Sequence, residues 1–312
     1  MIAVITTIQP PTEPVKRLSK LTDVIVVGDA KTPSYYNVGT FIPLEKQDAF
    51  NISKLTPINA YSRKNIGYLH AIADGHGVIY ETDDDNYPAE NWMQRGEVVD
   101  AIPLFGNKWV NPYRWFASMD DIWPRGIPLQ YTKDGIKSST TSISVVAPLQ
   151  QCLVNVSPDV DAVYRLLNKG SFRFRTRESV VVSDWAPTNS QNTWWFKRAF
   201  PLMYLPSYCS FRASDIWRGM FAQRCLREMG FGIVYHSADA IQHRNKHDLL
   251  KDFEQEVPLH LFNDKMASIL DDTSLTGRPI DDIHICYRSV VNSGILPEKE
   301  LYVLDAWLKN FV

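Results

Sequence analysis

The sequence lacks the features that mark several common protein classes. None of its apolar runs approaches the ~18 residues of a membrane-spanning helix. Its cysteines form no Cys-x-x-Cys pair, which argues against a structural zinc site or disulfide framework and favours reduced thiols. With 33 Lys and Arg against 35 Asp and Glu, it has no basic excess, so nucleic acid is not the expected partner.

The start of the sequence does not predict a secretory leader. The first residues, "MIAVITTIQPP", have neither a basic segment nor a long apolar core, and they are typical of a strand instead. We therefore expect a cytoplasmic protein without a transmembrane segment. The 312 residues, 45% hydrophobic and 22% charged, suffice for one large domain or for one domain with an extension.

Short β-branched runs alternate with helical patterns along the first part of the chain. "IAVITTI", "TDVIVVGD" and "GVIYETDDD" predict strands, and "SRKNIGYLHAIADG" predicts a helix that Ser62 caps and Gly75 closes. This order predicts an α/β fold with a mostly parallel sheet flanked by helices. Ligands of such sheets bind beyond the carboxyl ends of the strands, where Asp29 and Asp83–Asp85 fall.

The end of the chain carries an amphipathic helical pattern. In "EKELYVLDAWLKNFV" the apolar stripe consists of Leu301, Leu304, Leu308 and Phe311. We predict a main domain over residues 1–255 and a C-terminal helical extension over 256–312. By default the stripe folds back on the core. A homodimer through these helices, or docking at a membrane surface, is the alternative, although the basic excess of a membrane-binding helix is missing.

Three consecutive carboxylates, Asp83, Asp84 and Asp85, end one predicted strand. Adjacent carboxylates repel each other, and a hard divalent cation such as Mg²⁺ or Mn²⁺ can neutralise them. Such an ion takes oxygen ligands and is usually bound by carboxylates and phosphates together. The simpler reading is a solvated acidic turn. Arg63 and Lys64 begin the preceding helix and form a candidate anion site, with plain surface charge as the alternative.

Asp29, in "VVGDAKTP", ends the neighbouring strand. Its carboxylate can accept hydrogen bonds from a base or a ribose, or it can simply form the turn before Pro33. A metal site, a phosphate site and a nucleoside acceptor would together make a nucleotide-diphosphate site.

Five segments carry a resemblance to a known family. They are "VIVVGDAKTP", "SRKNIGYLHAIADGHGVIYETDDDN", "NPYRWFASMDDIWPRGIPL", "SPDVDAVYRLL" and "SFRASDIWRGMFAQRCLREMG". In this order, from about residue 24 to 245, they resemble the STELLO-type glycosyltransferases. The acidic stretch also looks like the Asp-x-Asp motif of GT-A transferases and of the reversibly glycosylated polypeptides, which are sugar-nucleotide mutases. The resemblance implies a GT-A fold with a Rossmann-like nucleotide half and an acceptor half.

The resemblance also implies roles for individual residues. Asp83 would contact the ribose or a Mn²⁺ or Mg²⁺ ion, Asp85 would bind that ion, and Asp84 would assist. His243 in "QHRN" would complete the metal shell, with His236 as its rival. The residues that would hold the nucleotide, the diphosphate or the donor sugar are Asp29, Arg63, Lys64, Trp123, Arg125 and Gly126. For the last three, in "IWPRGIPL", a tightly packed loop is the alternative.

An inverting transferase needs a carboxylate that deprotonates the acceptor hydroxyl. Asp215 in "RASDIWRG" is the candidate, although a Ser-Asp pair is also what a helix start favours. The alternative bases are Asp184, Asp120 and Asp121, and a retaining reaction would need none of them. Further candidates for the acceptor cleft are Arg212, Arg218, Trp194 and Trp195.

The leading hypothesis is a metal-dependent glycosyltransferase in polysaccharide or glycoconjugate biosynthesis. Its donor would be a nucleotide-diphosphate sugar, expected to be uridine-linked, and its acceptor a carbohydrate or a lipid-linked glycan. The alternatives are a sugar-nucleotide mutase with Arg125 as its self-glycosylating residue and an inactive GT-A scaffold. A metal phosphohydrolase would need more His and Asp ligands than the acidic turn supplies.

Overall fold

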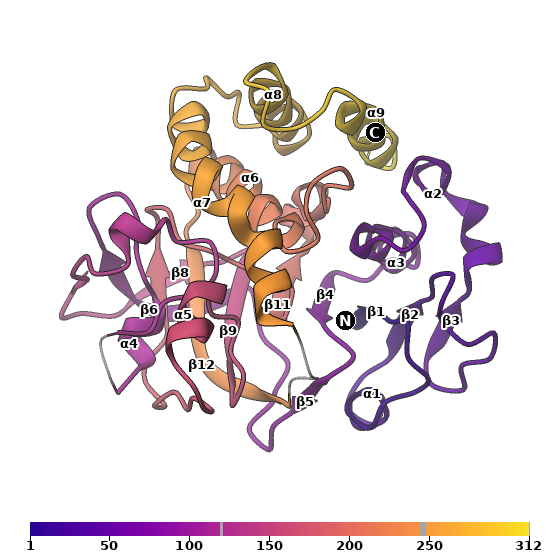
Figure 1. Ribbon diagram of the computed structural model, residues 1–312, viewed down its shortest axis with the longest axis horizontal. Coiled ribbons are helices and arrows are strands. Elements are labelled where there is room, and N and C mark those ends of the chain that lie inside the picture. Colours follow the sequence, from indigo (N-terminus) through magenta and orange to yellow (C-terminus); the bar gives the residue numbers. More distant parts are fainter. Residues whose placement is uncertain (119–120, 244–247, 312) are drawn as a thin grey trace.

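The computed structural model describes residues 1–118, 121–243 and 248–311. Within them lies a twelve-stranded mixed sheet with helices packed against it (Figure 1). The strands are β1 (Ile2–Thr6), β2 (Val24–Val27), β3 (Thr40–Ile42), β4 (Val78–Thr82), β5 (Asn86–Pro88), β6 (Val98–Phe105), β7 (Lys137–Ser138), β8 (Ile143–Val146), β9 (Leu149–Asn155), β10 (Val180–Val182), β11 (Asn192–Phe196) and β12 (Ile233–Gln242). The helices are α1 (Glu13–Leu18), α2 (Ile52–Leu55), α3 (Lys64–Ala73), α4 (Tyr113–Phe116), α5 (Ala162–Leu167), α6 (Ser214–Glu228), α7 (Leu249–Asp271), α8 (Pro279–Asn292) and α9 (Lys299–Leu308).

The main strand order is β3-β2-β1-β4-β11-β9-β12-β10-β6-β7, while β5 pairs with β12 and β8 with β6. The first four strands of this order are parallel, as the sequence predicts. Beyond β4 the sheet is mixed instead of mostly parallel, because β11 runs antiparallel to both β4 and β9, and β12 antiparallel to β10. The predicted α/β class is confirmed, whereas a purely parallel arrangement holds for β1–β4 only, and the other strands form both parallel and antiparallel pairs.

Helix α3 fixes the edge of the sheet at which the site forms. β1 and β2 are buried on both faces, and α3 packs on them through Gly67. A Cβ at Gly67 would lie only 2.7 Å from Val4 Cγ1 and 2.6 Å from Val27 Cγ2. Because α3 runs back along the sheet before β4, its first turn meets the carboxyl end of β4, and Lys64 Nζ donates to the Thr82 carbonyl at 2.7 Å.

Strand β12 brings a distant part of the chain to the same edge. It pairs in parallel with β9, shifts register between His236 and Ala240, and ends with Gln242 opposite Asn86 of β5. Since β5 follows the acidic turn directly, this pairing sets the end of β12 beside Asp83–Asp85.

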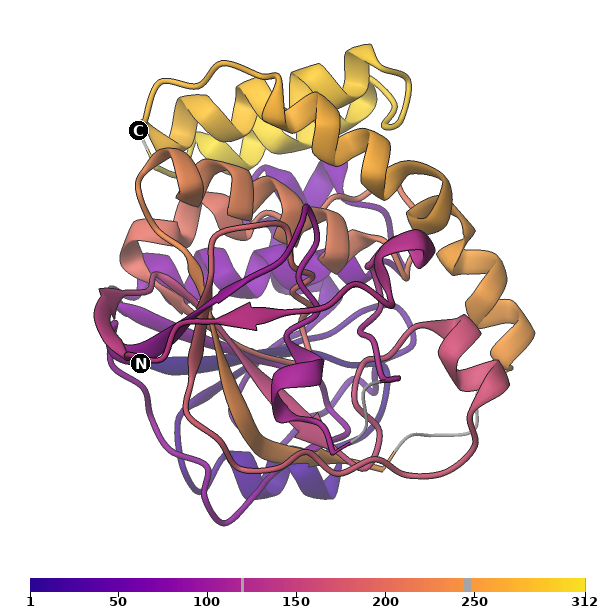
Figure 2. The same ribbon diagram turned by 90° about the vertical axis from the view of Figure 1, so that its left-hand side faces the viewer.

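The C-terminal helices fold back on the core, which confirms the default prediction. In both views α8 and α9 lie across one side of the molecule, over α6 and toward α3 (Figures 1 and 2). Trp307 of α9 donates through Nε1 to the Pro201 carbonyl at 2.8 Å, and its ring lies 6.5 Å from that of Tyr68 in α3. Among the helices described, none combines enough length with enough apolar character to span a bilayer. The division at residue 255 stays a prediction, and α7 runs across it.

We predict that Gly67→Ala lowers the free energy of unfolding by about 1–3 kcal/mol, because the added methyl group overpacks the contact between α3 and the sheet. Gly77→Ala is the matched control, since a Cβ at Gly77 meets no atom within 4 Å. Urea unfolding of both variants measures the difference. Equal stability of the two variants would contradict the close packing described.

Candidate active site

A cavity of about 420 Å³ opens at the carboxyl ends of the N-terminal strands. Residues that follow β1, β2 and β4 meet there with the end of β12 and the start of α6. The lining residues are Thr6, Thr7, Ile8, Gln9, Asp29, Lys31, Asn59, Ala60, Tyr61, Asp83, Asp84, Asp85, Arg125, Asp159, Arg165, Gln191, Phe211, Arg212, Asp215 and Gln242. The structure thus brings the predicted acidic cluster together with Asp29, Arg125 and Asp215.

Asp83, the first of the three consecutive carboxylates, is held by two side chains. It accepts hydrogen bonds from Tyr61 Oη at 2.7 Å and from Lys64 Nζ at 3.4 Å. Burial, opposed by Lys64 and reinforced by Asp85, raises the pKa of Asp83 to about 6. A carboxylate that burial destabilises in this way gains from any further cation that enters the cavity.

Asp84 and Asp85 are fixed by side chains from other elements. Asp84 accepts a hydrogen bond from the Thr7 hydroxyl, just after β1. Asp85 accepts from Gln242 Nε2, which lies 3.0 Å from each of its carboxylate oxygens. Gln242 also takes a hydrogen bond from Gln191 Nε2 at 2.7 Å. The acidic turn is therefore held from both halves of the sheet.

A fully buried ion cluster supports the turn from within the core. Glu81 of β4 lies 2.8 Å from Arg218 Nη1 of α6 and 3.6 Å from Lys64 Nζ of α3. It also accepts from Trp195 Nε1 at 3.0 Å and from the Tyr68 hydroxyl. Burial opposes the charge of Glu81, but Arg218 and Lys64 hold its pKa at about 2. Lys64 therefore forms ion pairs with both Glu81 and Asp83.

The two cations predicted to hold a diphosphate are turned inward. Arg63 donates through Nε to Gln47 Oε1 at 2.8 Å and through Nη1 to the Thr56 carbonyl at 3.1 Å. Lys64 is fully buried and reaches Asp83 from the core side. Neither residue lines the cavity, so this arrangement gives the predicted diphosphate contact no support.

In the described part of the chain, four other cations line the cavity, namely Lys31, Arg125, Arg165 and Arg212. Sequence reasoning missed Lys31 and Arg165. Lys31 lies two residues beyond Asp29 in "VVGDAKTP", at the end of a predicted strand, so its position was available as a signal. Arg165 belongs to a six-residue helix, and no local pattern in the sequence points to the cavity.

Asp29 organises the wall of the cavity next to β2. Its carboxylate accepts backbone N–H groups from Asn59 at 2.9 Å, from Ala60 at 3.1 Å and from Ala30 at 2.7 Å. These bonds fix the turn that leads into α3. Asp29 remains at the cavity surface, where its oxygens can accept from a ligand as well.

Arg125 is clamped between two carboxylates. It donates to Asp159 at 2.7–3.1 Å and, through Nη1 and Nη2, to both oxygens of Asp215 at 2.9 Å. Its Nη1 also donates to the Arg212 carbonyl. Burial opposes its charge, but the two carboxylates raise the pKa of Arg125 well above its usual value. The predicted base Asp215 is thus oriented by Arg125 at the cavity wall.

Several other predicted residues lie away from the cavity. Trp123 packs edge-on against Tyr164, with ring centroids 4.9 Å apart, and Gly126 offers its carbonyl to Asn263. Arg218, Trp194 and Trp195 are fully buried in the core. Of the alternative bases, Asp184 and Asp121 do not line the cavity, and Asp120 lies outside the described residues.

The structure does not group the predicted histidines with the acidic turn. His243 is exposed, and its ring stands edge-on to Tyr87 at 5.8 Å. Neighbouring residues at a strand end point to opposite sides, so Gln242 faces Asp85 and His243 does not. His236 is buried between Ser179 and Gln150, and burial lowers its pKa well below the usual value. The predicted metal role of either histidine has no support in this arrangement.

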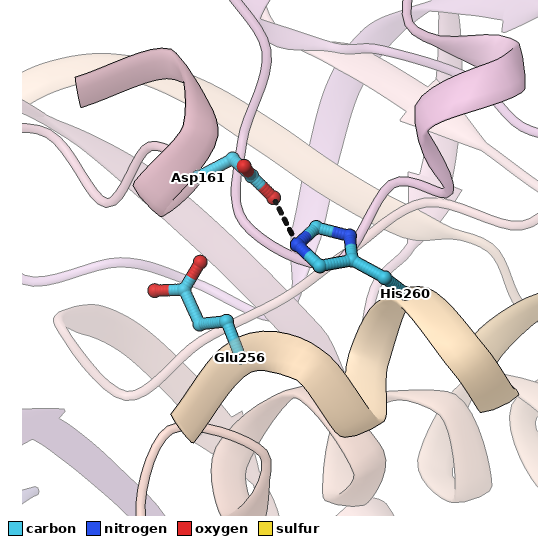
Figure 3. Close-up of side chains that lie close together, drawn as sticks. All are labelled: Asp161, Glu256 and His260. Carbon is cyan, nitrogen blue, oxygen red and sulfur yellow. Dashed lines mark ion pairs between the residues drawn. The ribbon is translucent and has the colours of Figure 1, made fainter. Parts of the chain in front are cut away.

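A different group of side chains has the composition of a metal site. Of the residues described, Asp161, Glu256 and His260 offer three ligand atoms within 4.8 Å of one another (Figure 3). This group lies outside the cavity lining, and sequence reasoning missed it because Asp161 is separated from the other two by about a third of the chain.

Known proteins with similar sequences support the resemblance. A family model described as STELLO glycosyltransferases matches residues 212–310. "Probable glycosyltransferase STELLO2" from Arabidopsis thaliana is 30% identical over 351 aligned positions, which cover 99% of this chain and 44% of that protein. By sequence, the chain belongs to the STELLO glycosyltransferase family.

A second STELLO relative agrees with this assignment. "Probable glycosyltransferase STELLO1" from the same plant is 27% identical over 350 positions, which cover 97% of this chain and 43% of that protein. The chain thus spans less than half the length of these curated relatives. The STELLO match over residues 212–310 includes α8 and α9, which corrects the end of the resemblance at about residue 245.

We predict that Glu81→Gln lowers the free energy of unfolding by about 3–5 kcal/mol, because it leaves Lys64 and Arg218 buried without their carboxylate. The control is Glu228→Gln, which breaks a partly exposed pair with Arg224 on α6 and should cost below about 1 kcal/mol. Chemical unfolding measures both. A similar small loss in the two variants would refute the importance of the buried cluster.

The low pKa of Glu81 predicts that the stability of the protein depends on pH. The pKa of Glu81 is about 2 in the folded protein and roughly 4.3 in an unfolded chain. Its contribution is therefore complete above the unfolded value and is lost as the pH falls toward 2. Unfolding midpoints between pH 6 and 3 should fall less steeply in Glu81→Gln than in the wild type. Parallel curves would show that Glu81 is not the titrating group.

Proposed function

We propose that this protein is a metal-dependent glycosyltransferase that uses a nucleotide-diphosphate sugar as donor. The observation that carries the proposal is the convergence of Asp83, Asp84 and Asp85 with the cations Lys31, Arg165 and Arg212 in one cavity. Its volume of about 420 Å³ falls in the roughly 300–1,000 Å³ of small-molecule sites. Membership of the STELLO family supports the same reaction class.

We further propose that the fold is of the GT-A type. The parallel strands β3-β2-β1-β4 with α3 form a nucleotide half, and the acidic turn directly follows β4. The strands beyond β4 and helix α6 supply the other wall of the cavity, as an acceptor half would.

The acidic turn fits a hard divalent cation, Mn²⁺ or Mg²⁺. Asp83 and Asp85 offer oxygen ligands, and the raised pKa of Asp83 marks a carboxylate short of positive charge. Such an ion, when bound, stabilises the charge that develops on the leaving diphosphate. In the proposed site Gln242 orients Asp85, and Tyr61 and Lys64 orient Asp83.

The remaining parts of the donor can be assigned to the other walls. Lys31, Arg165 and Arg212 line the cavity, and we assign them to the diphosphate. Asp29 and the backbone at Asn59 border the side next to β2, where a ribose or a base would find acceptors and polar backbone. A uridine-linked donor is our expectation.

We keep Asp215 as the proposed base of an inverting reaction. It lies at the cavity wall with both oxygens on Arg125, so its direction is fixed before an acceptor hydroxyl arrives. A retaining reaction would leave Asp215 the role of holding Arg125. The acceptor would be a carbohydrate or a lipid-linked glycan.

The mutase alternative is less well supported. It requires Arg125 to attack the sugar, but this guanidinium donates hydrogen bonds to two carboxylates and a carbonyl, and its pKa is raised. A guanidinium held in its charged form has no free electron pair for the attack. The transferase is therefore the better reading of this cavity.

We expect one class of nucleotide diphosphate or nucleotide sugar to bind only with Mn²⁺ or Mg²⁺. Asp85→Asn should weaken this binding at least about tenfold, because it removes a carboxylate ligand of the metal. Asp100→Asn, at an exposed position of β6, is the matched control and should bind like the wild type. Calorimetric titration of a nucleotide panel with each metal and with EDTA measures the effect.

The same titration can reject the proposal. If no nucleotide binds under any metal condition, the transferase and mutase readings both fail, and an inactive scaffold becomes the working hypothesis. Metal-dependent binding that Asp85→Asn leaves unchanged would move the donor site away from the acidic turn.

A further inference from the structure

Asp161, Glu256 and His260 meet where two helices face each other. Asp161 directly precedes α5, while Glu256 and His260 lie four residues apart on α7 and so share one face of that helix. In Figure 3 the three side chains point toward one another from the two elements. The group lies outside the proposed donor site, because none of its members lines the cavity.

Two atoms of this group lack the partner that burial requires. Asp161 Oδ2 and His260 Nε2 lie 3.7 Å apart, and among the residues that the structure describes neither atom has a hydrogen-bond partner. Asp161 is fully buried, and in Figure 3 its Oδ2 faces His260, with the carboxylate of Glu256 beside them. A buried polar atom without a hydrogen-bond partner is destabilising, and a ligand between these two atoms would satisfy both.

We propose that Asp161, Glu256 and His260 bind a divalent transition-metal ion, for which Zn²⁺ is the best match. One imidazole nitrogen and two carboxylate oxygens are the borderline donor set that Zn²⁺ accepts, whereas Mg²⁺ and Ca²⁺ prefer oxygen ligands alone. The ligand atoms lie within 4.8 Å of one another. Shifts of roughly 1 Å or less would bring them to the ~2.0–2.2 Å of zinc–ligand bonds. Water can supply a fourth ligand on the side of His260, whose side chain is 15% exposed.

The other contacts of the ligands orient them for such an ion. Asp161 Oδ1 accepts the Val163 N–H at 2.7 Å, which leaves Oδ2 directed at His260. Glu256 Oε2 accepts the Ala162 N–H at 2.7 Å, and Oε1 lies 2.6 Å from Arg212 Nη2. Outer hydrogen bonds of this kind fix the direction of metal ligands. Each carboxylate oxygen keeps a second lone pair for the ion.

The charge state of the group agrees with an ion at its centre. Burial, and then the nearby Glu256, raise the pKa of Asp161 to about 7, and burial lowers the pKa of His260. A bound cation would relieve the first effect, and a neutral imidazole is the form that binds metal. Because Glu256 also pairs with Arg212, which lines the cavity, the ion would help to fix that side chain at the wall of the proposed donor site.

Metal content and zinc titration test the proposal without any donor or acceptor. We use Asp85→Asn as the background, so that an ion at the acidic turn does not enter the count. In this background we expect one Zn²⁺ per chain after dialysis. Adding His260→Ala or Asp161→Asn should weaken zinc binding at least tenfold. Asn is as good a helix cap as Asp, so Asp161→Asn keeps α5 even if His260→Ala impairs folding.

His284→Ala is the matched control for the histidine. His284 also pairs with a carboxylate, at 3.2 Å from Asp305, but belongs to no group of three ligands among the described residues. It should keep the ion. The proposal is overturned if zinc binds only at millimolar concentration, if His260→Ala and Asp161→Asn keep the ion, or if His284→Ala loses it as well. None of these results bears on nucleotide binding, so the two proposals fail separately.

Discussion

The carboxylate of Glu81 joins the two halves of the molecule at the point where the cavity forms. It lies fully buried in β4 and contacts Lys64 and Tyr68 of α3, Arg218 of α6 and Trp195 of β11. A buried charge that loses its partner is strongly destabilising, so the cluster is stable only when all of its charged members are present. Lys64 also donates a hydrogen bond to Asp83 and so links the buried cluster to the acidic turn. The position of the acidic turn is thus a consequence of the core.

Acidic and basic side chains also lie together at the surface of the cavity. Of the described residues, six carboxylates and four cations line the cavity, and Arg125 pairs with two of the carboxylates, Asp159 and Asp215. Lys64 reaches Asp83, one of the three consecutive carboxylates of the turn, from the core side. The burial that raises the pKa of Asp83, together with the position of this carboxylate in the cavity, is the physical basis for proposing a divalent ion and a diphosphate there. Membership of the STELLO family adds weight to a sugar donor.

The N-terminal half of the fold and the acidic turn could be predicted from sequence. Buried β-branched strands and an amphipathic helix leave clear local patterns, and the rule for ligand sites at strand ends then points to Asp29 and Asp83–Asp85. The insertion of β11 beside β4 could not be predicted, because "NTWWF" is buried throughout and shows no alternation.

The roles of side chains whose partners lie far away in the chain also could not be predicted from the sequence. Arg63 and Lys64 look exposed at a helix start, and only the fold supplies Gln47 and Glu81 as their buried partners. His243 and Gln242 are neighbours, so a one-residue difference in strand register decides which of them faces Asp85.

A crystal grown with Mn²⁺ and a nucleoside diphosphate, measured at the manganese absorption edge, tests the acidic site most directly. We predict an anomalous peak beside Asp83 and Asp85, next to the diphosphate. Ordered nucleotide elsewhere, or manganese only at Asp161, Glu256 and His260, would contradict it.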